Sequence, residues 1–128
     1  RGYFNVGDVV IMTSALLLGR KYGAYIGAIG PALADLFLGY AVFVPITFVV
    51  KGIEGYLVGT VYNNKTTTSA LVATIVGGII IVAGYFIAEY FVFDPGVAIA
   101  SILTNTIQAV MSVIVSMILY AILRKRLG

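Results

Sequence analysis

Long runs of apolar residues cover most of this chain, and short polar segments separate them. A helix that crosses a bilayer needs about 20 mostly apolar residues, and fewer when neighbouring helices cover part of it. The runs therefore predict membrane-spanning helices connected by short loops. The predicted helices cover residues 6–19, 23–40, 45–62, 70–93 and 99–123.

Residues at the ends of these runs support the boundaries. Gly7-Asp8 is typical of a helix N-cap, and Pro45 suits the first turn of the third helix. Asp94-Pro95-Gly96 predicts a turn between the last two helices. We expect a single all-α integral membrane domain over residues 1–128, with no separate soluble domain.

Composition agrees with this class and excludes several functions. The chain is 61% hydrophobic and 10% charged, whereas a soluble domain carries about 25% charged residues. It contains no cysteine and no histidine, which removes disulfides, thiolate metal sites and Ser-His catalytic triads. No glycine-rich phosphate loop follows a strand. We therefore predict no catalytic residue, metal site, cofactor or nucleic-acid partner, and no ATP hydrolysis by this chain.

The basic residues orient the predicted bundle. Arg20-Lys21, Lys65 and Arg124-Lys125-Arg126 follow the first, third and fifth helices, so all three groups fall on one side of the membrane. The positive-inside rule makes that side, and the C-terminus, cytoplasmic. A bundle with both ends inside needs one more apolar helix before Arg1, and the charge pattern predicts that helix.

Lys51 and Glu54 interrupt the apolar run 45–62 at a spacing of three, which places them on one helix face. A charge near the bilayer centre costs a few kcal/mol, so such residues mark functional sites or buried pairs. Asp35 on the preceding helix is the natural partner of Lys51. The spacing is compatible with three roles: a ligand site, a structural ion pair, and an ion or proton relay through Asp35, Lys51 and Glu54.

A polar stripe runs along the last predicted helix at spacings of three and four. We expect Ser112 and Ser116 to form interhelical hydrogen bonds. Asn105 and Gln108 carry amides that both donate and accept, and they lie at the depth of Lys51, which favours ligand contacts. The stripe contains Ser101, Asn105, Gln108, Ser112 and Ser116.

Other residues suggest roles near the helix ends. Glu89 is expected to be a solvated carboxylate, and the tyrosines at the helix ends, including Tyr120, are expected to form an interfacial belt. An alternative role for Tyr3 and Tyr40 is to stack on a ring-shaped ligand instead of forming part of this belt. Small residues at spacings of three and four predict close helix packing, either within the chain or against a second membrane subunit. They are Gly23, Gly27, Gly52, Gly55 and Gly59.

Several motifs in this order resemble the S components of energy-coupling-factor (ECF) vitamin transporters, in the riboflavin and hydroxymethylpyrimidine branch. They are Gly2-Tyr-Phe-Asn-Val-Gly-Asp8, Ala15-Leu-Leu-Leu-Gly-Arg20, Gly30-Pro-Ala-Leu-Ala-Asp35, Lys51-Gly-Ile-Glu54-Gly and Asn105-Thr-Ile-Gln108. The resemblance covers essentially the whole chain. It implies a six-helix bundle of which about five transmembrane helices are present here, the first being absent.

The resemblance also implies a function. An S component binds a water-soluble vitamin or vitamin precursor near the outer face of a bacterial or archaeal cytoplasmic membrane. It associates with a transmembrane T component and two cytosolic ATPases, which hydrolyse the ATP. The segment from Tyr3 to Asp8, including Asn5, matches the lid loop of the family. The positions that match its pocket are Lys51, Glu54, Asn105 and Gln108, and Asp35 matches a motif of less defined role.

We therefore expect the chain to capture a vitamin or precursor, with specificity from Lys51, Glu54, Asn105 and Gln108. The main alternative is an ion- or proton-coupled transporter or channel subunit that uses Asp35, Lys51 and Glu54. A membrane enzyme that uses the carboxylates and a purely structural membrane subunit are weaker alternatives, the first because the chain has no histidine.

Overall fold

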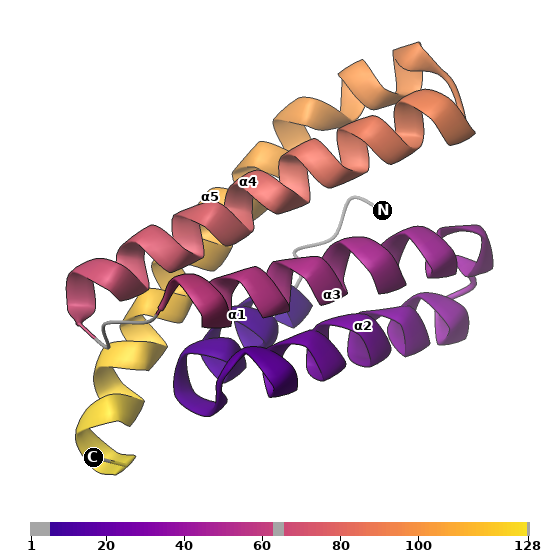
Figure 1. Ribbon diagram of the computed structural model, residues 1–128. Coiled ribbons are helices and arrows are strands. Elements are labelled where there is room, and N and C mark those ends of the chain that lie inside the picture. The colour runs from indigo at the N-terminus through magenta and orange to yellow at the C-terminus, as the bar shows by residue number, and fades with distance from the viewer. Residues whose placement is uncertain (1–5, 63–65, 128) are drawn as a thin grey trace.

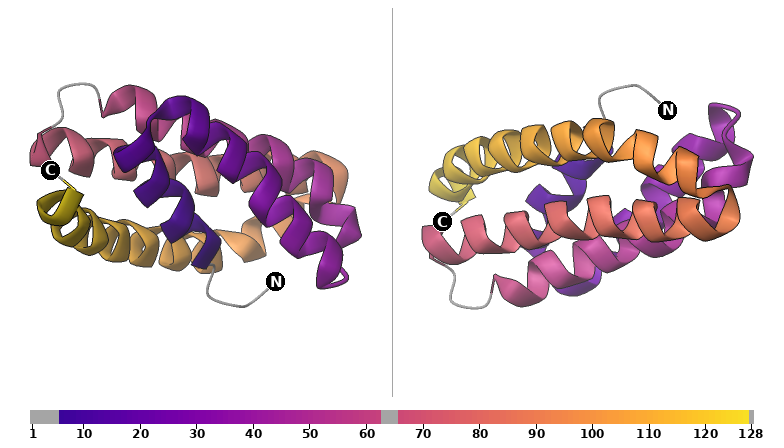
Figure 2. Two further views of the ribbon diagram at one scale, coloured as in Figure 1. Left: turned by 90° about the horizontal axis from the view of Figure 1, so that it is seen from below. Right: turned by 90° about the horizontal axis from the view of Figure 1, so that it is seen from above.

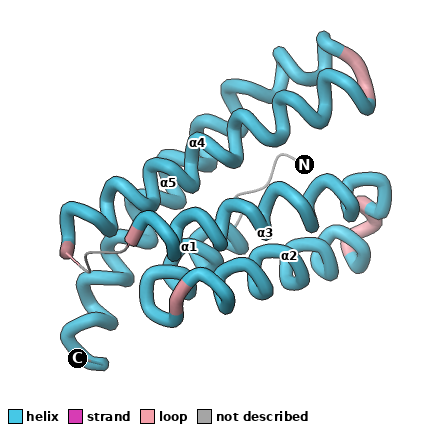
Figure 3. Tube along the Cα trace, viewed as in Figure 1, coloured by secondary structure: helices cyan, strands magenta, loops and turns pink. Residues whose placement is uncertain are grey.

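The structure is a computed structural model that describes residues 6–62 and 66–127 (Figure 1). Short connections join the helices, as the tube in Figure 3 shows. The elements are α1 (Val6–Leu18), α2 (Arg20–Phe37), the 3₁₀ turn η1 (Ala41–Phe43), α3 (Val44–Val61), α4 (Thr67–Val92) and α5 (Pro95–Leu127). Each predicted helix has a counterpart, and α5 is longer at both ends than expected.

Two antiparallel helix pairs form the bundle, α2 with α3 and α4 with α5 (Figure 1). α3 packs against α4, and α1 packs against α2, α3 and α5, so α1 closes the side between the two pairs (Figure 2). One end of the bundle holds η1 and the α4–α5 connection, and we call it the Asp94 end. The opposite end, which holds Gly19 and Arg124, is the Arg124 end. The two pairs diverge toward the Asp94 end in Figure 1.

The connection between α4 and α5 is tighter than the predicted three-residue turn. The Asp94 carboxylate accepts hydrogen bonds from the backbone N–H of Gly96 at 2.5 Å and of Val97 at 3.4 Å, so it caps α5. Pro95 is then the first residue of α5, where its missing N–H costs nothing. Pro95 and Gly96 therefore begin the helix instead of forming a turn outside it.

The contact between α2 and α3 depends on glycines from both helices. A Cβ atom on Gly23 would lie 2.6 Å from the Gly55 carbonyl oxygen, and one on Gly27 would lie 2.2 Å from the Lys51 carbonyl oxygen. Backbones that approach this closely leave no space for side chains. The predicted small-residue strips thus serve packing within the chain, and Gly59 extends the same contact to the backbone of Arg20.

Apolar side chains fill the bundle and also cover its surface. Met12, Val58, Ile81 and Tyr120 are among the buried core residues, while many large apolar side chains of α4 and α5 are exposed. Exposed apolar surface on this scale suits contact with lipid rather than water. Tyr120 is 2% exposed, so its assignment to an interfacial belt was wrong.

In the described part of the chain, three helical segments are long and apolar enough to cross a membrane: Ala41–Val61, Thr67–Val92 and Pro95–Lys125. α1 is apolar but has only 13 residues. α2 carries three charged residues, Arg20, Lys21 and Asp35, which lower its hydropathy. Three of the predicted spanning helices therefore have the length and apolar composition that a membrane span needs.

Polar groups at the Arg124 end tie α3 to α5. The hydroxyl groups of Tyr62 and Tyr120 are hydrogen-bonded at 2.5 Å, and Arg124 donates to the Tyr120 hydroxyl and to Thr67. Burial, followed by the Tyr120 hydrogen bond, raises the pKa of Tyr62 to about 12. The Tyr62 hydroxyl therefore keeps its proton at physiological pH.

Candidate functional site

A cluster of charged side chains lies inside the bundle between α1 and α3. Lys51 is 1% exposed, and Asp8 and Glu54 are fully buried. The Lys51 ammonium donates a short hydrogen bond to Asp8 Oδ1 and lies 4.0 Å from Glu54 Oε1. The helix spacing predicted the pair Lys51–Glu54, whereas the contact with Asp8 joins residues 43 positions apart.

Small residues make room for this cluster. A Cβ atom on Gly77 of α4 would lie 3.6 Å from Glu54 Cγ, 3.2 Å from Met12 Cε and 2.7 Å from Val58 Cγ2. The glycine therefore lets α4 close over the Glu54 side chain. Since Glu54 packs among apolar groups on this side, the cluster is shielded from solvent.

Asp8 was expected to begin its helix as a cap, and that assignment was wrong. It lies inside the first turn of α1, and its carboxylate faces Lys51 instead of the free N–H groups of its own helix. An acid in the first turn still benefits from the positive end of the helix dipole. In addition, the Lys51 ammonium is a positively charged partner for the Asp8 carboxylate, and a buried charge needs such a partner.

The sequence had suggested that Asp35 lies at the level of Lys51, but the structure places it elsewhere. The glycine contact places Gly27 of α2 beside the Lys51 backbone, and Asp35 follows eight residues, or about 12 Å, further along the helix. There its carboxylate accepts a hydrogen bond of 2.5 Å from the Thr47 hydroxyl. Lys51 is therefore paired with Asp8, and the expected Asp35–Lys51 pair is replaced by Asp35–Thr47.

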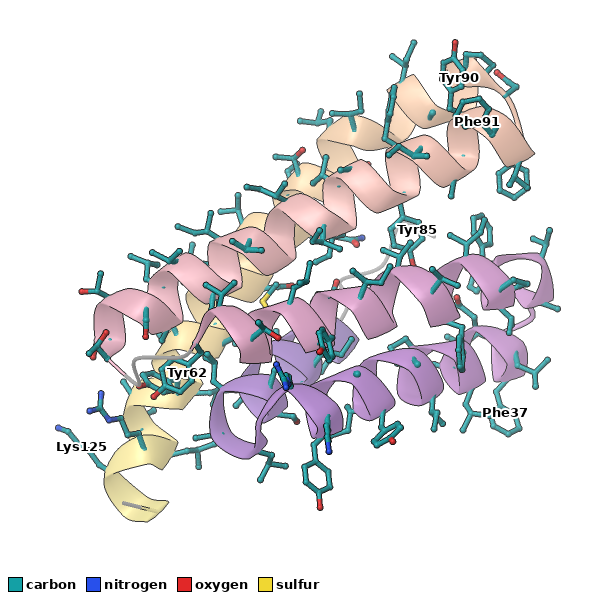
Figure 4. All side chains as sticks on the ribbon, in the orientation of Figure 1. Phe37, Tyr62, Tyr85, Tyr90, Phe91 and Lys125 are labelled. Carbon is teal, nitrogen blue, oxygen red and sulfur yellow. The ribbon has the colours of Figure 1, made fainter. Side chains whose placement is uncertain are left out.

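Tyr85 connects these two groups of polar residues. Its hydroxyl lies 3.1 Å from the Thr47 hydroxyl, and its ring centroid lies 5.3 Å from the Lys51 ammonium. In Figure 4 the labelled Tyr85 side chain points from α4 into the space between the two helix pairs. An aromatic face beside a buried ammonium stabilises its charge. The polar residues of α1, α2, α3 and α4 thus form one connected cluster.

The stripe on α5 faces the bundle, as predicted. Ser112 and Ser116 are fully buried, and Ser101, Asn105 and Gln108 are half-buried. Ser101 donates to Glu89 Oε2 at 3.4 Å, and Glu89 is only 6% exposed. The expectation of a solvated Glu89 was therefore wrong, because α5 covers this carboxylate and supplies a donor.

The remaining predicted residues lie elsewhere. Tyr40 is half-buried beside η1, with its ring centroid 6.4 Å from that of Phe43 in an edge-to-face arrangement. Tyr3 and Asn5 fall outside the described residues. Sequence reasoning missed Thr47 and Tyr85, because threonine and tyrosine are common in membrane helices. Only their neighbours in the folded structure show that these two belong to the polar cluster. Asp8 carried a signal, because an acid in a mostly apolar helix needs a partner.

A groove of about 680 Å³ runs between α4 and α5, away from this cluster. Its described lining is apolar apart from Thr106, whose hydroxyl donates to the Ile102 carbonyl of its own helix. Such a surface offers no polar contact that selects a water-soluble ligand. The candidate site is therefore the polar cluster and not the groove.

Comparison with known proteins connects this arrangement to a family. The family model for the S component of ECF-type riboflavin transporters matches residues 1–125. The chain belongs to this S-component family. It is therefore a vitamin-binding subunit of an ECF transporter, a multi-pass membrane protein and a transporter component rather than an enzyme.

Two relatives are similar to this chain over most of its length. The S component is 28% identical over 119 residues to the thiamine precursor transporter HmpT of Lactococcus lactis subsp. cremoris, covering 92% of this chain and 68% of the relative. It is also 40% identical over 131 residues to a Pyrococcus woesei protein described as an uncharacterized protein in gap 3'region, covering 100% of this chain and 86% of the relative.

Proposed function

We propose that this S component captures a water-soluble vitamin or vitamin precursor at the outer face of a bacterial or archaeal cytoplasmic membrane. The observation that carries the proposal is the placement of polar groups. Asp35, Lys51 and the half-buried amides of Asn105 and Gln108 lie in the half of the bundle toward the Asp94 end, where the two helix pairs diverge, and Glu54 lies near the middle. Arg20, Lys21 and Arg124 lie at the opposite end, which the positive-inside rule makes cytoplasmic.

The proposed binding residues come from three helices. Asn105 and Gln108 of α5 are half-buried, so their amides are accessible to a ligand that enters between the helix pairs. Lys51 and Glu54 of α3 are almost fully buried and form the inner boundary of the site, with Asp35 of α2 nearer the Asp94 end. Tyr40 and the segment that contains Tyr3 and Asn5 complete the proposed set. Polar contacts in such a low-dielectric site discriminate strongly between ligands.

The energy for uptake comes, in this proposal, from partner subunits. The S component binds a transmembrane T component and two cytosolic ATPases, and these hydrolyse the ATP. The exposed apolar faces of α4 and α5 contact lipid. The name of the relative HmpT makes a thiamine precursor the first ligand to test.

The experiment is calorimetric titration of the purified S component in detergent with a panel of vitamins and precursors. We expect one of them to bind, and Glu54→Ala or Asn105→Ala to weaken that binding by more than tenfold, equivalent to about 1.4 kcal/mol. Thr106→Ala is the matched control, because Thr106 neighbours Asn105 but its side chain is exposed and bonded within α5. Unchanged affinity in both test variants would contradict the site assignment.

A further inference from the structure

We propose that Glu54 is a protonated carboxylic acid that donates a hydrogen bond to Asp8, so that the Asp8–Lys51–Glu54 cluster stores one proton inside the bundle. The cluster is then a proton-binding site, separate from the role of these residues in capturing a vitamin.

The first argument is the pattern of unsatisfied oxygen atoms. Asp8 Oδ1 accepts from Lys51, but Asp8 Oδ2 has no hydrogen-bond partner among the described residues. Both carboxyl oxygens of Glu54 are buried and likewise lack a hydrogen-bond partner in the described ranges. A buried polar atom without a partner destabilises the folded state, because it has lost its hydrogen bonds to water. A proton on Glu54 supplies the missing donor, and Asp8 Oδ2 is the missing acceptor.

The second argument is the balance of charge. Asp8 and Glu54 share one ammonium, and their carboxyl groups also face each other. Two carboxylates and one ammonium carry a net charge of −1 in a site that water does not reach. Because like charges in a shared buried site cannot both ionise without a large penalty, one of the two carboxyls keeps its proton. A neutral Glu54 reduces the net charge of the cluster to zero.

The third argument decides which carboxyl holds the proton. Asp8 accepts the short hydrogen bond from the ammonium, whereas Glu54 Oε1 lies 4.0 Å from it. The negative charge is therefore better stabilised on Asp8, which also lies in the first turn of α1. Glu54 packs instead against Met12, Val58 and the backbone of α4 at Gly77.

Within residues 6–62 and 66–127, no further charged group faces the cluster. The groups that face Glu54 and Lys51 in the described structure are Asp8 from α1 and the Tyr85 ring from α4. Asp35 of α2 bonds to Thr47 instead. α5 approaches through Ser116, whose hydroxyl contacts the Met12 sulfur. Deprotonation of Glu54 would therefore leave an uncompensated buried charge.

Infrared difference spectroscopy tests the proposal directly. The purified protein, in a maltoside detergent without ester groups, is expected to show the C=O stretch of a protonated carboxylic acid at neutral pH, with a small downshift in D₂O. Glu54→Gln should remove this band. Glu89→Gln is the matched control, since Glu89 is also buried but accepts from Ser101, and it should leave the band in place. A spectrum with carboxylate bands alone, or a band lost only in the Glu89 variant, would overturn the proposal.

Thermal unfolding provides a second measurement. Glutamine mimics a protonated glutamate, so Glu54→Gln should melt within about 3 °C of the parent. The double variant Asp8→Asn/Glu54→Gln leaves the buried Lys51 ammonium without a carboxylate and should lower Tm by about 10 °C. A Glu54→Gln variant that fails to fold, or that melts as low as the double variant, would count against a protonated Glu54.

Discussion

Lys51 shows how a membrane bundle retains a buried ammonium. Its charge faces the Asp8 carboxylate, the carboxyl of Glu54 and the ring of Tyr85, which come from three different helices. Each contact replaces part of the hydration that burial removes. Loss of one contact should therefore be measurable, but different contacts should have different costs.

Two substitutions at Tyr85 should separate the contributions of its hydroxyl and its ring. Tyr85→Phe removes the hydrogen bond with Thr47 and keeps the aromatic face over Lys51, so it should cost about 1 kcal/mol of unfolding free energy. Tyr85→Leu also removes the ring and should cost roughly 1–2 kcal/mol more. Thermal unfolding in detergent measures both variants. Equal losses would show that the ring contributes nothing to Lys51.

At the scale of helices, the α2–α3 pair determines which residues meet. Gly23 and Gly27 of α2 lie against the backbone of α3 near Gly55 and Lys51. This close contact fixes the register of the two helices. Asp35 consequently reaches Thr47, and Lys51 is left to the acid on α1.

Two glycines of α2 provide a test of that contact. Gly27→Ala places a methyl group 2.2 Å from the Lys51 carbonyl oxygen, so the helices must separate at a cost of roughly 2 kcal/mol or more. A Cβ atom on Gly30 meets nothing within 4 Å beyond its chain neighbours, so Gly30→Ala should cost clearly less than Gly27→Ala, with the contact to the following Pro31 ring as its main penalty. Chemical unfolding in detergent compares the two. Similar stabilities would exclude the glycine contact as the determinant of register.

At the scale of the whole molecule, charge is distributed unevenly between the two ends. The described basic residues apart from Lys51 lie at the Arg124 end, and Figure 4 shows Lys125 pointing away from the bundle. Asp35 and Glu89 lie toward the Asp94 end, Asp94 lies in the α4–α5 connection, and Glu54 lies near the middle of the bundle. This asymmetry predicts one orientation in the membrane, with the proposed binding site toward the outside.

Single cysteines test the orientation, because the chain has none of its own. Pro95→Cys and Lys125→Cys introduce exposed thiols at the two ends. In intact cells, a membrane-impermeant thiol reagent should label position 95 and should reach position 125 only after the membrane is permeabilised. The opposite pattern would reverse the orientation and place the proposed site on the cytoplasmic side.

The sequence by itself determined the helices, the membrane class and the family, because hydropathy and motif order are properties of the chain read locally. It also indicated that Lys51 and Glu54 share a face and that the α5 stripe points inward. Only the tertiary structure decided the partners. Asp8 is 43 residues from Lys51, and no spacing rule connects residues on different helices. Their meeting depends on the α2–α3 register and on α1 packing against α3, and these are set by which side chains are small enough to let the backbones approach.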